Sequence, residues 1–122
     1  MMPVGPLWDL ARHAGARWEA SWSAWSGADR AEGEVWRYVR DIYVAAAQGQ
    51  DVEAAITHAD EQWRVYATAN NRAIEHAPKI KRGPSAGHST IGHRYTSPEF
   101  LQSKLIHIRY MIAQAVKVAP CA

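Results

Sequence analysis

Residues 6–26 read PLWDLARHAGARWEASWSAWS, and their large apolar and small side chains recur at helical spacing. Separations of three and four residues place one set of side chains along a single helix face. We call this set the Trp seam: Trp8, Ala11, Gly15, Trp18, Trp22 and Trp25. Since Pro6 suits a first helical position and Gly27 offers a stop, we expect a helix over about 6–26. Glycine inside a helix costs about 1 kcal/mol relative to alanine, so Gly15 predicts close approach by another backbone or a bulky ring.

Two more helices follow, joined by a short turn. The first spans about 34–48, and its apolar residues form a stripe with further apolar residues beside it: Val35, Val39, Ile42 and Ala46, with Trp36, Tyr43 and Ala47. So wide an apolar surface predicts contact on more than one side. Asp51 is a good N-cap and Pro78 a stop, which predicts a helix over 52–77, antiparallel to its predecessor. The pair Asn70-Asn71 indicates either a seam position or a kink or early end in this helix.

Residues 79–97, KIKRGPSAGHSTIGHRYTS, change the character of the chain. Three glycines, one proline and four lysines or arginines, with no acid, predict a long basic loop. Ser97-Pro98-Glu99 then supplies a cap, a first-turn proline and a first-turn acid, so we expect a helix over 98–118. Its inner face comprises Leu101, Leu105, Ile108, Ile112 and Ala115. The predicted fold is all-α: one domain over 1–122, an irregular antiparallel bundle of four helices with the basic loop between the third and fourth.

Composition bounds the protein class. The chain has 122 residues, 48% hydrophobic and 21% charged, which is typical of one folded domain. Its single cysteine, Cys121, excludes an internal disulfide and a cysteine-based zinc finger. No run of about 18 apolar residues is present, so no membrane span is expected. These features predict an intracellular protein, soluble or part of a complex.

Charge is unevenly distributed along the chain. Residues 1–61 hold five arginines and ten acids, a net charge of −5, whereas residues 62–122 hold nine basic residues and two acids, a net charge of +7. Such asymmetry indicates an acidic partner, nucleic acid or contact between unlike surfaces of neighbouring molecules. The alternative is that the two halves fold together and their charges compensate internally.

Sites of catalysis and metal binding are not evident. No two histidines have the i, i+3 or i+4 spacing of helix-borne metal ligands, and the sequence contains no GxSxG, GxxxxGK[ST] or GxGxxG motif. We therefore predict no metal site, no cofactor, no catalytic residue and no small-molecule substrate. A small enzyme that uses His88, His93 and the hydroxyls of Ser85, Ser89 and Thr90 is the least favoured hypothesis.

The tryptophans favour an interaction protein. Six tryptophans are many for a core of this size, and tryptophan is enriched at protein interfaces. A four-helix core filled by alanine can accept about three indoles before overpacking becomes costly. We predict that Trp8, Trp18, Trp22 and Trp25 bind a protein partner or a second copy. The predicted function is a non-enzymatic structural subunit of a larger assembly, such as a multi-subunit complex or a virion; the alternative is that all six indoles pack internally.

Nucleic-acid binding by residues 79–95 is the alternative function. This segment concentrates positive charge and one aromatic ring: Lys79, Lys81, Arg82, Arg94 and Tyr95. Cations of this kind release counterions from a phosphate backbone, and an aromatic ring can stack on a base. The same residues would also suit an acidic protein partner. No basic recognition helix follows a tight turn, so a helix-turn-helix is not predicted.

Overall fold

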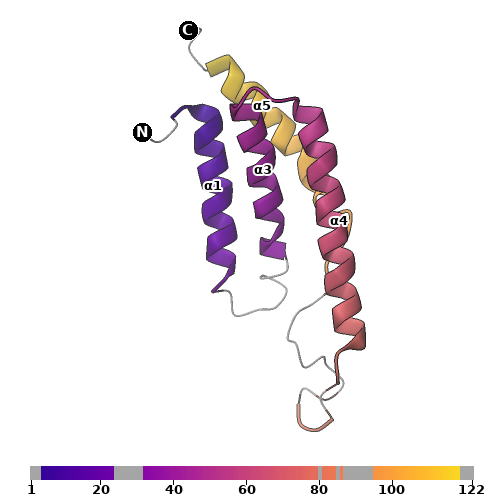
Figure 1. The fold of residues 1–122 in the computed structure, drawn as a ribbon. Helices are drawn as coiled ribbons and strands as arrows, with labels where there is room; N and C mark the ends of the chain where they lie inside the picture. The colour runs from indigo at the N-terminus through magenta and orange to yellow at the C-terminus, as the bar shows by residue number, and fades with distance from the viewer. Residues whose placement is uncertain (1–3, 24–31, 80, 85, 87–94, 119–122) are drawn as a thin grey trace.

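The computed structural model describes residues 4–23, 32–79, 81–84, 86 and 95–118. Within these residues every regular element is helical (Figure 1). The elements are α1 (Pro6–Ser21), α3 (Val35–Ala47), α4 (Val52–His76), the short 3-10 helix η1 (Gln102–Lys104) and α5 (Leu105–Val118). The predicted all-α class with four helices is confirmed for this part of the chain. Most of the expected basic loop lies outside the described residues.

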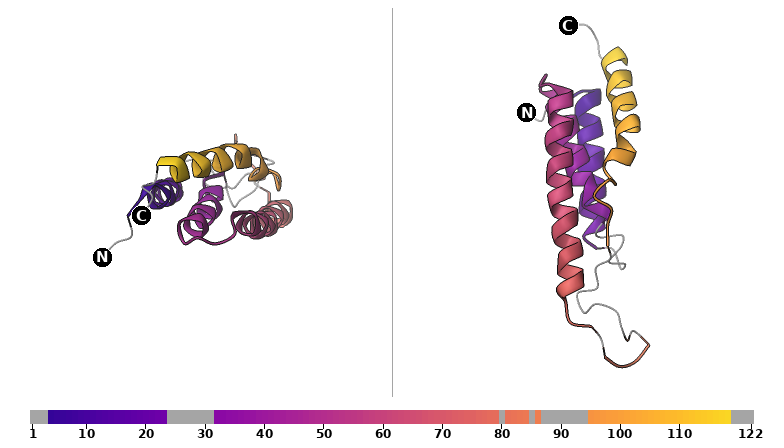
Figure 2. Two further views of the ribbon diagram at one scale, coloured as in Figure 1. Left: turned by 90° about the horizontal axis from the view of Figure 1, so that it is seen from above. Right: turned by 90° about the vertical axis from the view of Figure 1, so that its right-hand side faces the viewer.

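Three helices lie side by side, and the fourth crosses one face of the row that they form. Seen from above, α1, α3 and α4 follow one another, with α3 in the middle (Figure 2). α5 lies across one side of this row and packs against α1 and α3. The C-terminal end of α4 extends past the ends of α1 and α3 (Figure 1). None of the described helices is long and apolar enough to cross a membrane.

The core is centred on α3 and on one indole of α4. The largest fully buried side chains are Val35, Val39, Ile42, Trp63, Leu101 and Ile108. α1 contributes the small buried side chains Ala11 and Ala14, which allow its backbone to pack closely on α3. α3 itself packs against α1, α4 and α5. Its wide apolar surface correctly predicted contact on more than one side.

Local signals explain the turn between α3 and α4. Gly49 takes a left-handed backbone conformation with φ of 74°, which glycine adopts without steric cost, and ends α3. The side chain of Asp51 accepts a hydrogen bond of 3.1 Å from the Ala54 amide and caps α4. α4 ends at His76, directly before the backbone becomes extended ahead of Pro78. Asn70 and Asn71 lie within this uninterrupted helix.

The predicted end of the first helix near Ser26 is wrong, because α1 ends at Ser21 and the next two residues form a turn. Two serine hydroxyls donate hydrogen bonds to carbonyls of the last helical turn, from Ser21 to Trp18 at 2.6 Å and from Ser23 to Ala20 at 3.2 Å. Serine competes in this way with the helical backbone pattern and favours helix ends. The expected stop at Gly27 lies outside the described residues.

The expected helix start at 98 is also wrong. Residues 98–101 form turns, η1 follows, and α5 begins only at Leu105. The amides of Phe100, Ser103 and Lys104 donate to carbonyls three residues earlier, the pattern of a 3-10 turn. The Ser97 hydroxyl does accept the Glu99 amide at 3.1 Å, so the predicted cap residue caps a turn instead of an α-helix.

Candidate functional site

Trp18, a predicted partner-binding residue, already has several contacts within the protein. Its indole Nε1 donates to Glu34 Oε2 at 3.0 Å. The guanidinium carbon of Arg40 lies 4.9 Å from the centroid of the Trp18 ring, within the range of a cation–π contact. The ring of Trp22 meets Trp18 edge to face, with centroids 5.0 Å apart. Trp18 therefore helps join α1 to the start of α3, with only part of its surface left for a partner.

The other members of the Trp seam differ in exposure. Trp8 is half-buried, Trp22 is 57% exposed, and Trp25 lies outside the described residues. A Cβ added at Gly15 would lie 3.3 Å from Cδ of Arg40. The close approach predicted at Gly15 is therefore present, but the neighbour is the Arg40 side chain and not a backbone or a ring. Among the tryptophans that the structure describes, the fully buried one is Trp63, which lies outside the seam.

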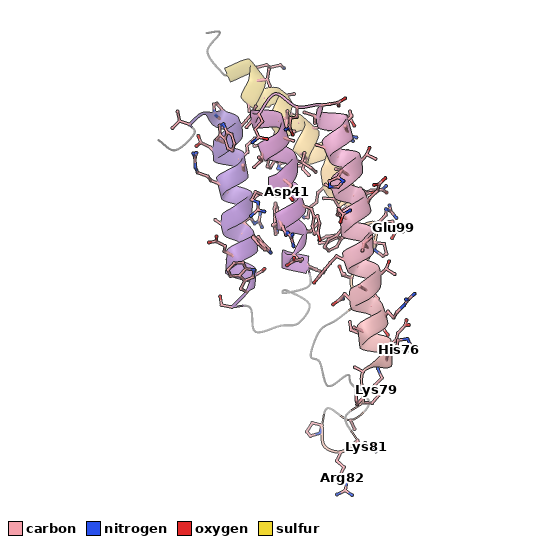
Figure 3. All side chains as sticks on the ribbon, in the orientation of Figure 1. Asp41, His76, Lys79, Lys81, Arg82 and Glu99 are labelled. Atoms are coloured by element: carbon pink, nitrogen blue, oxygen red, sulfur yellow. The ribbon has the colours of Figure 1, made fainter. Side chains whose placement is uncertain are left out.

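The basic residues that were assigned to nucleic acid or an acidic partner are only partly described. Lys79, Lys81 and Arg82 are exposed and lie beyond the C-terminal end of α4, past His76 (Figure 3). None of the ion pairs within the described residues involves these three cations. Tyr95 is 57% exposed, and Arg94 lies outside the described residues.

The residues considered for catalysis are not described by the structure. His88, His93, Ser85, Ser89, Thr90 and Cys121 all lie outside the described residues. Among the residues that are described, no group of three or more histidines, cysteines and acids lies close enough to hold a metal ion.

Charge compensation between the two halves of the chain is limited in the described part. Ion pairs that join residues 1–61 to residues 62–122 are Asp60 with Arg64, at 2.9 Å, and Glu53 with Arg109, also at 2.9 Å. The second pair uses both carboxylate oxygens and links α4 to α5. The hydrogen bond from Arg109 lowers the pKa of Glu53. Both arginines are partly exposed, so these pairs contribute little to stability.

An exposed apolar face on α5 was not predicted from the sequence. Ile106 is 83% exposed, Tyr110 57% and Val116 59%, although Ile108, Ile112 and Ala115 of the same helix are buried. Together with the exposed Ala113, the three exposed residues form what we call the outer face of α5. Their spacing of four, three and three residues places them along one side of the helix. The sequence did contain a signal for this face. Between Leu105 and Ile112 the helix has more apolar residues than one inner stripe can hold, so some of them had to face outward.

Tight packing around Trp63 fixes the segment that leads into α5. The indole Nε1 of Trp63 donates to the Ser97 carbonyl at 3.1 Å. About two turns further along α4, Asn71 both donates to the Thr96 carbonyl and accepts from the Thr96 amide, each at 2.9 Å. Burial raises the pKa of Tyr66, whose ring lies 5.4 Å from Trp63. Residues 96 and 97 are thereby attached to α4, and this attachment sets where η1 and α5 begin.

Comparison with family models, with curated proteins and with solved structures finds no match to this chain, so its function has to be argued from the residues described above.

Proposed function

We propose that this protein is a non-enzymatic interaction subunit of a larger assembly and that it docks through the outer face of α5. The observation that carries the proposal is the exposure of Ile106, Tyr110 and Val116 on a helix whose opposite side is part of the core. Apolar residues exposed along one side of a surface helix favour a protein interface, because water contact with them is unfavourable. Tyrosine at the centre of the face is a residue type enriched at interface hot spots.

The charges of α5 support a partner of unlike chemistry over a second copy. The helix sequence LIHIRYMIAQAVKV contains no acid. Its cations are Arg109, already paired with Glu53, and Lys117. Two copies docked through this same face would bring cations of like sign together, which is unfavourable. The partner that fits best is an amphipathic helix with an apolar stripe flanked by acidic residues, docked by apolar contact and oriented by charge.

The Trp seam stays in this proposal as a second contact. Trp22 at the end of α1 is the described member with the most exposed surface, whereas Trp18 already uses its indole N–H within the protein. The proposal also keeps the expected architecture: one domain, with the helices forming an irregular antiparallel bundle and the basic loop between α4 and α5. The proposed docking through α5 depends neither on the Trp seam nor on this architecture.

Site-directed photo-cross-linking in the source cell tests the proposed docking face. A photoreactive residue at position 106 is expected to cross-link one recurring protein, and the same residue at the exposed position of Glu61 on α4 is the control. With the photoreactive residue placed at position 110 instead, the same protein should be cross-linked, and the double variant Ile106→Ser with Val116→Ser should abolish this cross-link. The melting temperature should change by no more than a few degrees, since both substituted sites are exposed. Equal labelling from positions 106 and 61 would contradict docking through α5. A cross-link to a second copy would contradict the unlike partner.

Nucleic-acid binding is kept as the second candidate because Lys79, Lys81 and Arg82 are exposed and take part in no ion pair within the described residues. Lys79 Nζ does donate to the Ile74 carbonyl at 3.4 Å. Each phosphate contact contributes about −0.7 to the slope of log affinity against log salt for a single strand. Replacing all three by glutamine should therefore lower the magnitude of that slope by about 2 in a binding assay with single-stranded RNA. The matched control is the replacement of Arg12, Arg37 and Lys117, which removes equal charge from other surfaces. Absent or salt-independent binding would contradict this function.

A further inference from the structure

A cavity of about 360 Å³ lies between α1, α3, η1 and α5, apart from the outer face of α5 and from the basic residues beyond α4. Its walls are apolar and come from three helices: Leu10 and Ala14, Val39, and Ile108 and Met111. Ala14, Val39 and Ile108 are buried, so this part of the cavity reaches the core. Pockets for small molecules have volumes of about 300–1,000 Å³. The volume of this cavity lies at the small end of that range and suits a small ligand.

The charged side chains that line the cavity are basic, and Tyr43 and Ser103 add uncharged hydroxyls. Arg17 of α1 and Lys104 of η1 both line it, together with His13 and His107. No acidic residue is among the described lining residues. The histidines add ring nitrogens that can donate hydrogen bonds. A site with this composition is complementary to an anionic group.

The indole of Trp36 places the two cations. The guanidinium carbon of Arg17 lies 4.0 Å from the Trp36 ring centroid, and Nζ of Lys104 lies 4.8 Å from the same centroid. Lys104 is also 4.8 Å from the ring centroid of Phe100. These rings stabilise the cations without neutralising them. Neither Arg17 nor Lys104 takes part in an ion pair within the described residues.

The electrostatic environment of Lys104 also favours binding of an anion. Burial lowers the pKa of Lys104, the charge of Arg17 lowers it further, and the charge of Glu32 opposes both effects. Two positive groups therefore repel each other beside a partly desolvated site. An anion bound between them would remove this repulsion and form charge-assisted hydrogen bonds, which are about twice as strong as neutral ones.

We propose that this cavity binds a small amphipathic anion, with its anionic head at Arg17 and Lys104 and its apolar body against Leu10, Val39, Ile108 and Met111. The shared chemistry of the ligand is a carboxylate or phosphate head on a short apolar chain or ring. This site departs from the expectation that no small molecule binds. It is also independent of the proposed docking function, since it uses the opposite side of α5.

Octanoate is the first probe, with octyl phosphate, octanol and butyrate as comparisons. Met111 lies on the apolar wall, so its methyl signal in methionine-labelled protein reports entry of the ligand's apolar chain. We expect octanoate to shift the Met111 signal saturably with one site per chain. Octanol should bind at least tenfold more weakly than octanoate because it lacks the negative charge. Butyrate should also bind at least tenfold more weakly than octanoate, because its apolar chain is shorter. The ratio of octanoate to octyl phosphate affinity identifies the preferred head.

Two charge variants and two controls test the placement of the head. Lys104→Met and Arg17→Met keep an apolar stem over Trp36 but remove the charge, and each should weaken octanoate about tenfold while leaving octanol unchanged. Arg12→Met on α1 and Lys117→Met on α5 remove the same charge away from the cavity and should leave octanoate affinity unchanged. Circular dichroism confirms that each variant is folded. Equal affinity for octanoate and octanol, no shift of Met111, or equal weakening by the control variants would overturn the proposal.

Discussion

Replacement of Trp63 by phenylalanine should destabilise the protein more than any other conservative aromatic change. The Trp63 side chain has no exposed surface, and its Nε1 donates to the Ser97 carbonyl at 3.1 Å. Its ring also lies 5.8 Å from Tyr38 and 6.1 Å from Phe100, measured between centroids. Phenylalanine keeps an aromatic ring but loses both the N–H donor and part of the buried surface.

The magnitude follows from these two losses. The Ser97 carbonyl still accepts from the Phe100 amide at 3.1 Å when the indole donor is lost, so this hydrogen bond accounts for about 0.5–1.5 kcal/mol. Aromatic side chains bury about 150–250 Å² each, so the smaller ring gives up roughly 50 Å², or about 1 kcal/mol at 25 cal/mol per Å². The free energy of unfolding should therefore fall by about 1.5–2.5 kcal/mol, and the melting temperature by roughly 6–10 °C.

Urea unfolding followed by far-ultraviolet circular dichroism measures this change without relying on the removed fluorophore. Trp22→Phe is the matched control, because Trp22 is 57% exposed and its change should stay within about 0.5 kcal/mol. If the two variants have equal free energies of unfolding, then Trp63 is not the centre of the core and the reasoning is wrong.

Three further changes test other contacts. Asn71→Ala removes both hydrogen bonds to the Thr96 backbone and should cost about 1–3 kcal/mol in urea unfolding, whereas an unchanged midpoint would show that these bonds do not fix the segment. Gly33→Ala brings a methyl group into collision with the Ser21 side chain and should cost about 1–3 kcal/mol, partly recovered by adding Ser21→Gly; a stabilising Gly33→Ala would contradict this contact. Glu53→Gln removes the ion pair to α5: because that pair lowers the pKa of Glu53, its contribution is present above the unfolded pKa and is lost as pH falls through the folded pKa. The variant should therefore be less stable than the natural protein at neutral pH, and the difference should shrink in acid; a difference independent of pH would argue against the pair.

Helix positions were predictable where the signal is local. The cap at Asp51, the glycine at position 49 and the proline at 78 act through neighbouring residues only, and α4 begins and ends close to where they predict. The end of α1 was not predictable, because serine hydroxyls can either face solvent or bond the helix carbonyls. The start of α5 depends on hydrogen bonds from α4, which no local pattern around residue 98 contains.

Assignment of helix faces was less predictable than helix positions. On α1 the buried residues are Ala11 and Ala14, whereas among the described tryptophans of the seam Trp8 and Trp18 are half-buried and Trp22 is exposed. Periodicity shows which side chains share a face but not which neighbouring helix covers that face. The outer face of α5 was missed for the same reason. The cavity was not predictable at all, since its lining comes from three segments far apart in the sequence.

Both proposed sites depend on how α4 positions a helix that it barely contacts. α5 packs on α1 and α3, and its connections to α4 include the pair of Glu53 with Arg109 and the backbone of residues 96 and 97. Trp63 and Asn71 hold that backbone from positions about two turns apart on α4, so Leu101 enters the core and Lys104 reaches the cavity. A rotation of α5 about its axis would expose the inner stripe and bury the outer face. The side-chain hydrogen bonds from α4 therefore select which face of α5 is exposed and keep Lys104 on the cavity side.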